Sequence, residues 1–164
     1  MKLTIDAETK QFQKWIGEYA EALPRDVQPT ALRALALEFV GRVIVHTPVD
    51  TGRARSGWLA YAEHSGKQFD AGGSGTPKAK AARVQGKSEG SFGEDFRGKD
   101  QYVEVINGVP YIVQLEFGSS EQGNRMGMVR VAFREMQGKA DDIFLKELEK
   151  ANKKATAKSR GIRG

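Results

Sequence analysis

The sequence of 164 residues contains no cysteine and only two histidines, His46 and His64. Without cysteine there is no disulfide scaffold, no thiol catalysis and no zinc or iron–sulfur site built on thiolate ligands. The spacing of the two histidines matches no metal-binding motif. No apolar run approaches the roughly 18 residues of a membrane span. The sequence therefore predicts neither a cofactor nor a membrane partner.

Proline is also scarce, with 5 residues, whereas glycine is frequent, with 19. The length suits one domain with a substantial core, which we place at residues 1–150. Residues 64–100 hold 8 of the glycines, and their only large apolar side chains are Phe69, Val84, Phe92 and Phe96. Burial of so few apolar groups is expected to offset little ordering entropy. The sequence therefore predicts a flexible insertion or arm at 64–100.

The formal net charge of +5 arises at the end of the chain, and without that end the charge would be −1. From position 150 onward there is no acid and there are six basic residues: Lys150, Lys153, Lys154, Lys158, Arg160 and Arg163. We expect residues 151–164 to form a basic, disordered tail. The tail could contact nucleic-acid phosphates, or it could be a frayed helix end whose lysines suit the helix dipole.

Apolar periodicity predicts amphipathic helices packed on a small antiparallel sheet, which is an α+β fold. The expected elements are a short lead-in strand at 3–5, helices at 12–23 and 30–46, strands at 55–64 and 102–106, and a long helix from residue 128. Thr30 is the expected N-cap of the second helix, and Asn107-Gly108 is a strong turn signal. Residues 111–117 fit either a return strand or one helical turn.

Two patterns suggest an enzyme, yet each lacks the context that its chemistry needs. Residues 81–88 fit a relaxed phosphate-loop pattern, but neither flank predicts the strand and helix that such a loop requires. His46, Asp50 and Ser56 could be written as a hydrolase triad, although Ser56 lacks the Gly-x-Ser-x-Gly turn. His46 at a helix end is explained more simply by the helix dipole. The sequence therefore predicts no catalytic residue.

The most specific cluster is residues 46–56, His-Thr-Pro-Val-Asp-Thr-Gly-Arg-Ala-Arg-Ser. Pro48 disfavours helix at the residue before it, Asp50 is expected to accept backbone N–H bonds in an Asx-type turn, and Gly52 can take a positive φ. Arg53 and Arg55 would then project from the start of a strand. The simplest interpretation of this cluster is a turn that stops the preceding helix.

A second cluster, Tyr-Ile-Val-Gln-Leu-Glu-Phe-Gly at 111–118, precedes the last helix. In this order the two clusters resemble the motifs of the neck and tail-completion proteins of long-tailed bacteriophages, a family of head–tail joining proteins akin to minor tail protein Z. The resemblance spans most of the chain. The matching residues are Pro48, Asp50, Thr51, Gly52, Arg55 and Ser56 in the first motif, and Tyr111, Glu116 and Gly118 in the second.

The sequence departs from the family pattern at three places. Ile112 stands where the family has alanine, and Ser119 stands where it has threonine. The family's proline-rich approach to the last helix is replaced by residues 126–133, Met-Gly-Met-Val-Arg-Val-Ala-Phe. These departures bear on how the last helix begins.

The resemblance implies a structural virion protein rather than an enzyme. The implied assembly is a cyclic homo-oligomer of roughly six or twelve copies, located in the virion at the neck or the head-proximal end of the tail after assembly in the host cytoplasm. The implied partners are a tail terminator or tail tube protein and the head–tail connector or adaptor proteins. Phe69, Phe92 and Phe96 would belong to an assembly arm, and the basic tail could face packaged DNA.

Two functions of other classes stay open from the sequence. A small, non-specific nucleic-acid-binding protein acting through the basic tail would bind with a steep salt dependence, although the rest of the chain is near neutral. A small hydrolase would need convergent polar groups, and the sequence offers no such set.

Overall fold

The computed structural model describes residues 27–98, 101–118 and 127–161. Within these ranges the elements are α2 (Gln28–His46), α3 (Arg53–His64), α4 (Pro77–Ser88), β1 (Gly90–Asp95), β2 (Tyr102–Asn107), α5 (Ile112–Phe117), α6 (Met128–Gln137) and α7 (Ala140–Gly161). The strand predicted at 3–5, the helix predicted at 12–23 and the basic residue Arg163 lie outside the described residues.

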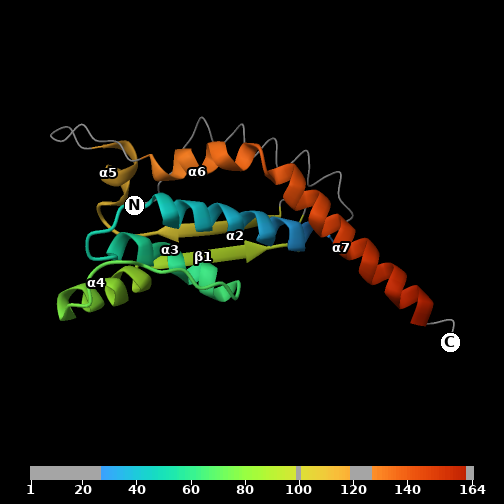
Figure 1. Cartoon of the computed structure of the whole chain (residues 1–164), viewed down its shortest axis with the longest axis horizontal. Coiled ribbons are helices and arrows are strands. Elements are labelled where there is room, and N and C mark those ends of the chain that lie inside the picture. Colours follow the sequence, from blue (N-terminus) through green and yellow to red (C-terminus); the bar gives the residue numbers. More distant parts are fainter. Residues whose placement is uncertain (1–26, 99–100, 119–126, 162–164) are drawn as a thin grey trace.

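Helix α2 is the central element of the described chain (Figure 1). It packs against α6 and α7 on one side and against α3 and β2 on the other. Strands β1 and β2 are antiparallel, with Gly90 opposite Asn107 and Asp95 opposite Tyr102. Helices on a small two-stranded antiparallel sheet confirm the predicted α+β class.

Two groups of buried side chains surround α2. The larger group joins α2 to α3, α5 and the start of α6, and it includes Val40, Val43, Ile44, Trp58, Tyr61, Ile112 and Met128. The smaller group joins the first half of α2 to α6 and α7, and it consists of Ala31, Leu35, Met136, Ala140 and Phe144. Burial of these apolar surfaces, at about 25 cal/mol per Å², supplies the main driving force for the fold.

Helix α2 matches the sequence expectation at its end but not at its start. It begins at Gln28 with Val27 as N-cap, so Thr30 is not the cap. Pro29 explains the earlier start, because its fixed φ and missing N–H suit the first turn. Thr47, directly before Pro48, is extended with ψ 123°, so the helix stops where the sequence predicts.

The strand predicted at 55–64 is wrong, because this segment is helix α3. Ala54, Trp58, Tyr61 and Ala62 are buried, at the spacing of one helical face. A period of two would have placed Trp58 and Tyr61 on opposite faces of a strand. The aromatic content favoured a strand, but helical packing against α2 decided the local structure.

The flexible insertion predicted at 64–100 is also wrong. The segment contains helix α4 and strand β1. It needs few large apolar side chains because α4 packs on α3 through the small buried residues Ala79 and Gly86. β1 is ordered by its ladder of hydrogen bonds with β2.

The end of the chain differs from expectation in two respects. The long helix predicted from residue 128 is divided at Gly138 into α6 and α7. α7 then continues to Gly161, so the tail predicted to be disordered from residue 151 is helical over most of its length. Alanine and lysine, which are strong helix formers, account for this continuation. The ambiguous segment at 111–117 is a helical turn, α5.

Candidate functional site

The first sequence motif forms the tight connection between α2 and α3. Gly52, the N-cap of α3, has φ +85°, a conformation that side-chain-bearing residues rarely adopt. A Cβ atom on Gly52 would also lie within 3 Å of the carbonyl oxygens of Ala71 and Gly72. Glycine is therefore required here both for its backbone conformation and for the close approach of the 71–72 segment.

Arg55 joins the two helices of this connection. Its Nε donates to the Thr47 carbonyl at 2.7 Å, and its Nη2 donates to the Val45 carbonyl at 3.2 Å. These carbonyls belong to the C-terminal end of α2, where a cation also complements the helix dipole. Ser56 is buried, and its amide donates to the Gly52 carbonyl at 3.0 Å. Arg55 therefore holds the helix connection in place, and the Ser56 amide makes the first hydrogen bond of α3.

Asp50 does not have the predicted role. Its side chain is exposed and makes no hydrogen bond within the described chain, so the expected Asx-type turn is not formed. The positive φ of Gly52 and the bonds from Arg55 define the turn instead. Pro48 and Thr51 lie in the same connection and are partly buried.

Arg53 is a further anchor of this region. Its guanidinium donates through Nε to Glu89 Oε2 at 2.9 Å, and Nη2 donates to Glu89 Oε1. These bonds lower the pKa of Glu89 and raise that of Arg53. The same guanidinium lies 5.9 Å from the ring centroid of Tyr111, which belongs to the second motif. Arg53 therefore connects the first motif to both Glu89 and Tyr111.

The second motif is organised around Glu116, whose side chain is fully buried. Its carboxylate accepts from the Val129 amide at 2.8 Å, from the Arg130 amide at 3.3 Å and from Arg130 Nε at 3.0 Å. The Glu116 carbonyl accepts from Arg130 Nη2 at 2.8 Å. A carboxylate at this position satisfies free amides at the N-terminus of α6 and complements the helix dipole. Gly118, at φ +83°, ends α5 directly afterwards.

Thr47 joins the first motif to the start of α6, which Glu116 of the second motif caps. Its Oγ1 donates to the Val43 carbonyl at 2.6 Å and lies 3.2 Å from the sulfur of Met128. Met128 directly precedes the amide bound by Glu116, and Thr47 itself is bound by Arg55. We call this end of the molecule, made of residues 45–56 and 109–118 with the first turn of α6, the motif end; it lies at the left of Figure 1.

The residues predicted to form an assembly arm are instead packed within this chain. Phe69 lies against Gly41 of α2, where an added Cβ would meet the Phe69 ring at 2.9 Å. Phe92 contacts the rings of Tyr61 and His64 at 5.7 and 4.5 Å. The Arg33 guanidinium lies 4.6 Å from the Phe96 ring centroid. All three rings therefore make contacts within this chain, and Phe92 is also 37% exposed.

The basic residues expected to form the tail lie on α7. Lys150, Lys153 and Lys154 are exposed, and Lys150 forms an ion pair with Glu147 at 2.5 Å. Lys158 and Arg160 also fall within the helix. Five of the six basic residues therefore lie on α7, and Arg163 lies outside the described residues.

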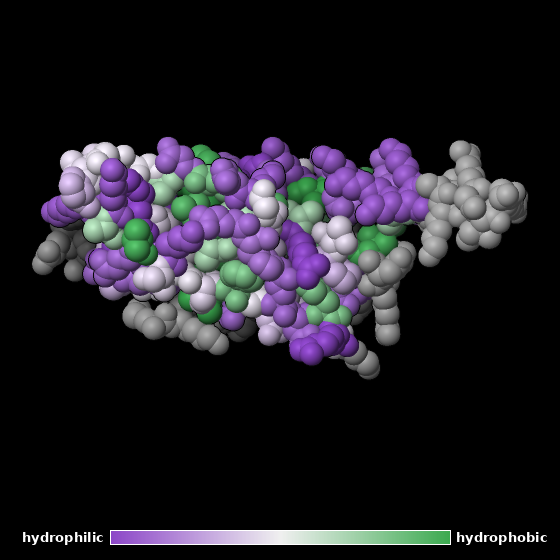
Figure 2. Space-filling model, turned by 90° about the horizontal axis from the view of Figure 1, so that it is seen from below, coloured by the Kyte–Doolittle hydropathy of each residue, from purple (hydrophilic) through white to green (hydrophobic). Residues whose placement is uncertain are grey.

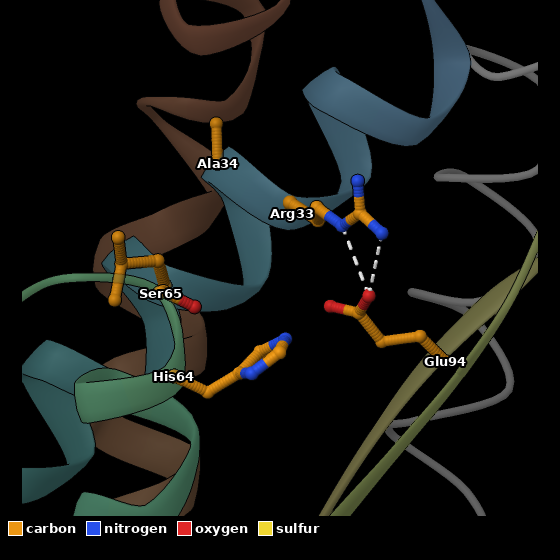
Figure 3. A pocket seen from close by; sticks show the side chains of 6 residues that line it. Arg33, Ala34, His64, Ser65 and Glu94 are labelled. Carbon is orange, nitrogen blue, oxygen red and sulfur yellow. Dashed lines mark hydrogen bonds and ion pairs between the residues drawn. The ribbon is translucent and has the colours of Figure 1, made fainter.

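A cavity of about 350 Å³ lies on the described surface between α2, the end of α3 and β1 (Figure 3). Arg33 donates from Nε and Nη2 to Glu94 Oε2 at 2.9 and 2.8 Å, and His64 lies beside this pair. No local pattern indicates this pair, because its members are 61 positions apart in the chain. The cavity holds no nucleophile bonded to a base.

The enzyme-like patterns are not assembled into sites. Residues 81–88 lie within α4, so their amides are used by the helix rather than converging on a phosphate. His46 Nε2 lies 2.8 Å from Glu135 Oε1, and within the described chain no hydrogen bond connects His46, Asp50 and Ser56. In the same residues no cluster of His, Asp and Glu could hold a metal ion, and no helix is long and apolar enough to cross a membrane.

Comparisons with protein-family models, curated proteins and solved structures found no match to this chain.

The ion cluster between α2 and α6 predicts an acid-dependent stability. Arg42 Nη1 lies 2.7 Å from Glu135 Oε2, and this bond, followed by that of His46, lowers the pKa of Glu135. A carboxyl whose pKa is lowered by folding stabilises the fold above its ordinary pKa, and the stabilisation is lost as the pH falls through the folded value.

We therefore expect Glu135→Gln to flatten the decline of melting temperature between about pH 5 and pH 3. Thermal melts across this range provide the measurement. Glu104→Gln, at an exposed position on β2, is the matched control and should keep the wild-type profile. Identical profiles for wild type and Glu135→Gln would show that this ion cluster does not contribute to the loss of stability in acid.

Proposed function

We propose that this protein is a structural subunit of a long-tailed bacteriophage virion. In this proposal it forms a ring at the neck or the head-proximal end of the tail, and joins the tail to the head. Its partners would be further copies of itself, a tail terminator or tail tube protein, and the head–tail connector or adaptor proteins. The basis of the proposal is the resemblance of the two motifs to the neck and tail-completion family.

One structural observation supports the proposal beyond the sequence: the two motifs lie together at one end of the molecule, where the Arg53 guanidinium is 5.9 Å from the Tyr111 ring centroid. Arg55 caps the end of α2, Glu116 caps the start of α6, and Thr47 contacts Met128 at that start. Two unrelated turns of the chain would not be expected to lie side by side in this way. The roles of Arg55 and Glu116 are also architectural, which agrees with a subunit whose function is to present surfaces rather than to catalyse a reaction.

The motif end also presents apolar surface. Val45, Val49 and Phe117 are large apolar side chains that are 64%, 40% and 39% exposed. All three lie within the motifs or directly beside them. Exposed apolar groups gathered in one region are typical of protein–protein interfaces. This surface is therefore our candidate for the contact between neighbouring subunits.

A ring requires a heterologous interface, in which two different surfaces of the subunit meet and the rotation closes. Many weak contacts then add up through the symmetry of the assembly. Because residues 64–100 form α4 and β1, a disordered arm has no part in this proposal.

Substitution of Val45 tests the proposed contact surface. We expect Val45→Lys to leave the melting temperature near that of wild type, because the side chain is exposed and a cation suits the C-terminal end of α2. The same change should prevent ring formation, measured by native mass spectrometry and sedimentation velocity. Val84→Lys, at a 72% exposed position on α4, is the matched control and should still assemble.

The proposal as a whole is tested by whether peptides of this sequence occur in purified virions, and in how many copies. Multiple copies per particle at the head–tail junction would support it. A protein that stays outside virions, or that forms no ring alone or with tail proteins, would overturn it.

A further inference from the structure

We propose that helix α4 is a binding surface for the phosphate backbone of double-stranded DNA. This inference goes beyond the structural role proposed above and does not depend on the basic residues of α7. It rests on the charge of α4, on how the helix is fixed to the body, and on the kind of side chain it exposes.

α4 is basic and carries no acid of its own. Its charged residues are Lys78, Lys80, Arg83 and Lys87. Of the nearby acids, Glu89 is paired with Arg53, whereas Asp70 is exposed and accepts from the Gly72 amide at 2.8 Å. Glu63 binds Lys87, but both side chains are more than 40% exposed, so this pair is weak and screened.

Two lysines of α4 lie where the helix dipole disfavours positive charge. Lys78 and Lys80 lie in the first turn of α4, where the helix dipole favours acids, and that turn contains none. Both side chains are exposed and form no ion pair in the described part of the chain. Lysines at a helix N-terminus with no acid to pair with are locally unfavourable, and unfavourable local choices of this kind are found at functional surfaces. An external anion would supply the missing compensation.

α4 is held rigidly, so these charges have fixed positions. The helix approaches α3 so closely that a Cβ atom on Gly86 would lie 2.1 Å from the Arg53 carbonyl oxygen. Arg83 Nη1 donates to the Gly72 and Ser74 carbonyls, at 3.1 Å each, and this ties the preceding loop to the helix. A preorganised surface loses little entropy on binding.

The exposed face of α4 favours duplex DNA over other anionic partners. Val84 is its one large apolar side chain, too little for insertion into a bilayer surface. The helix has no aromatic residue on which unstacked bases could stack, as single-strand binding requires. Figure 2, seen from the side on which α4 lies, shows hydrophilic residues around small hydrophobic spots at that end of the molecule. Lysines that contact phosphates position DNA but do not read its sequence.

The test compares two triple variants of the full chain by fluorescence anisotropy with a labelled duplex of about 20 base pairs. Lys78, Lys80 and Lys87 are changed to glutamine in the first variant, and Lys150, Lys153 and Lys154 in the second. Glutamine is a good helix former, so circular dichroism and melting temperature should match wild type for both. Each variant removes the same charge, so the two differ only in the helix affected.

The α4 variant should reduce the slope of log affinity against log salt by about 2.7, since each phosphate contact contributes about 0.9. Between about 50 and about 200 mM salt, wild-type affinity would then fall about 40-fold further than that of the variant. The α7 variant should keep most of the wild-type slope, and changes of duplex sequence should have little effect.

Four results would overturn the inference. They are a wild-type protein that does not bind duplex, loss of binding in the α7 variant alone, tighter binding of a single strand of the same length, and binding only to vesicles that contain phosphatidylglycerol.

Discussion

Gly86→Ala is expected to lower the free energy of unfolding by about 2 to 3 kcal/mol, the upper range for overpacking a close contact. The atoms that a Cβ would meet are all backbone atoms of Arg53: the carbonyl oxygen at 2.1 Å, the carbonyl carbon at 2.9 Å and Cα at 3.0 Å. Backbone cannot rotate away as a side chain can. Helices α3 and α4 must therefore separate, which would also disturb the bonds between Arg53 and Glu89.

Urea unfolding provides the measurement for Gly86→Ala, and Gly75→Ala is the matched control. Gly75 lies in the loop that leads into α4, and an added Cβ there would meet nothing within 4 Å. The control should be neutral or slightly stabilising, because alanine restricts the unfolded chain. Equal effects of the two changes would mean that the close helix contact is not important for stability.

The same contact explains why α4 could not be predicted from the sequence. Between positions 64 and 100 the chain has too few large apolar residues for composition to predict a packed helix. α4 is ordered instead by small residues, Ala79 and Gly86, which bring two helix backbones into contact. In the sequence, a glycine that permits close packing cannot be distinguished from one that permits flexibility.

Prediction succeeded where a strong local pattern agreed with the tertiary packing. The alternation of Val103 and Val105 with polar residues predicted β2, and the apolar face of α2 together with Pro48 predicted where that helix ends. The strand predicted at 55–64 was wrong because aromatic residues favour strands on average, whereas here Trp58 and Tyr61 pack on one face of helix α3.

The residues of the motif end were found from the sequence, but their roles were not. Asp50 was expected to form the turn and is exposed, whereas Arg55, expected only to project from a strand, caps α2. Asn107 was expected to mark a turn. Its buried side chain also donates to the Ala54 carbonyl at 2.8 Å and accepts from the Val109 amide at 3.1 Å. The Val109 contact is local and belongs to the expected turn, whereas the Ala54 contact joins residues 53 positions apart and has no local signature.

Glu116→Ala is expected to lower the free energy of unfolding by about 3 kcal/mol or more, because it removes one partner of a buried ion pair and leaves the other without compensation. The variant would leave the Val129 and Arg130 amides at the start of α6 without their acceptor. It would also leave Arg130 Nε without its acceptor, while Nη2 could still donate to the backbone carbonyl of residue 116. α6 and the packing of Met128 against Thr47 should weaken together.

Glu116→Gln separates the loss of charge from the loss of the acceptor. The amide oxygen can still accept one of the bonds at the start of α6, but the attraction to Arg130 and to the helix dipole is lost, so we expect a smaller decrease of about 1 to 2 kcal/mol. Glu104→Gln, at an exposed position on β2, should change stability by less than about 0.5 kcal/mol. Urea unfolding of the three variants should therefore rank Glu116→Ala as the least stable, then Glu116→Gln, then Glu104→Gln.

A double-mutant cycle with Arg130→Met then tests the pairing directly, because Arg130 is the only side chain that donates to Glu116 in the described residues. In the wild-type background this change should destabilise the fold, since it leaves the buried carboxylate without its cation. In the Glu116→Gln background the same change should cost less, by a coupling energy of about 1 kcal/mol or more. Additive effects would show that Glu116 acts on the α6 amides alone, and the motif end would then depend on helix capping without the ion pair.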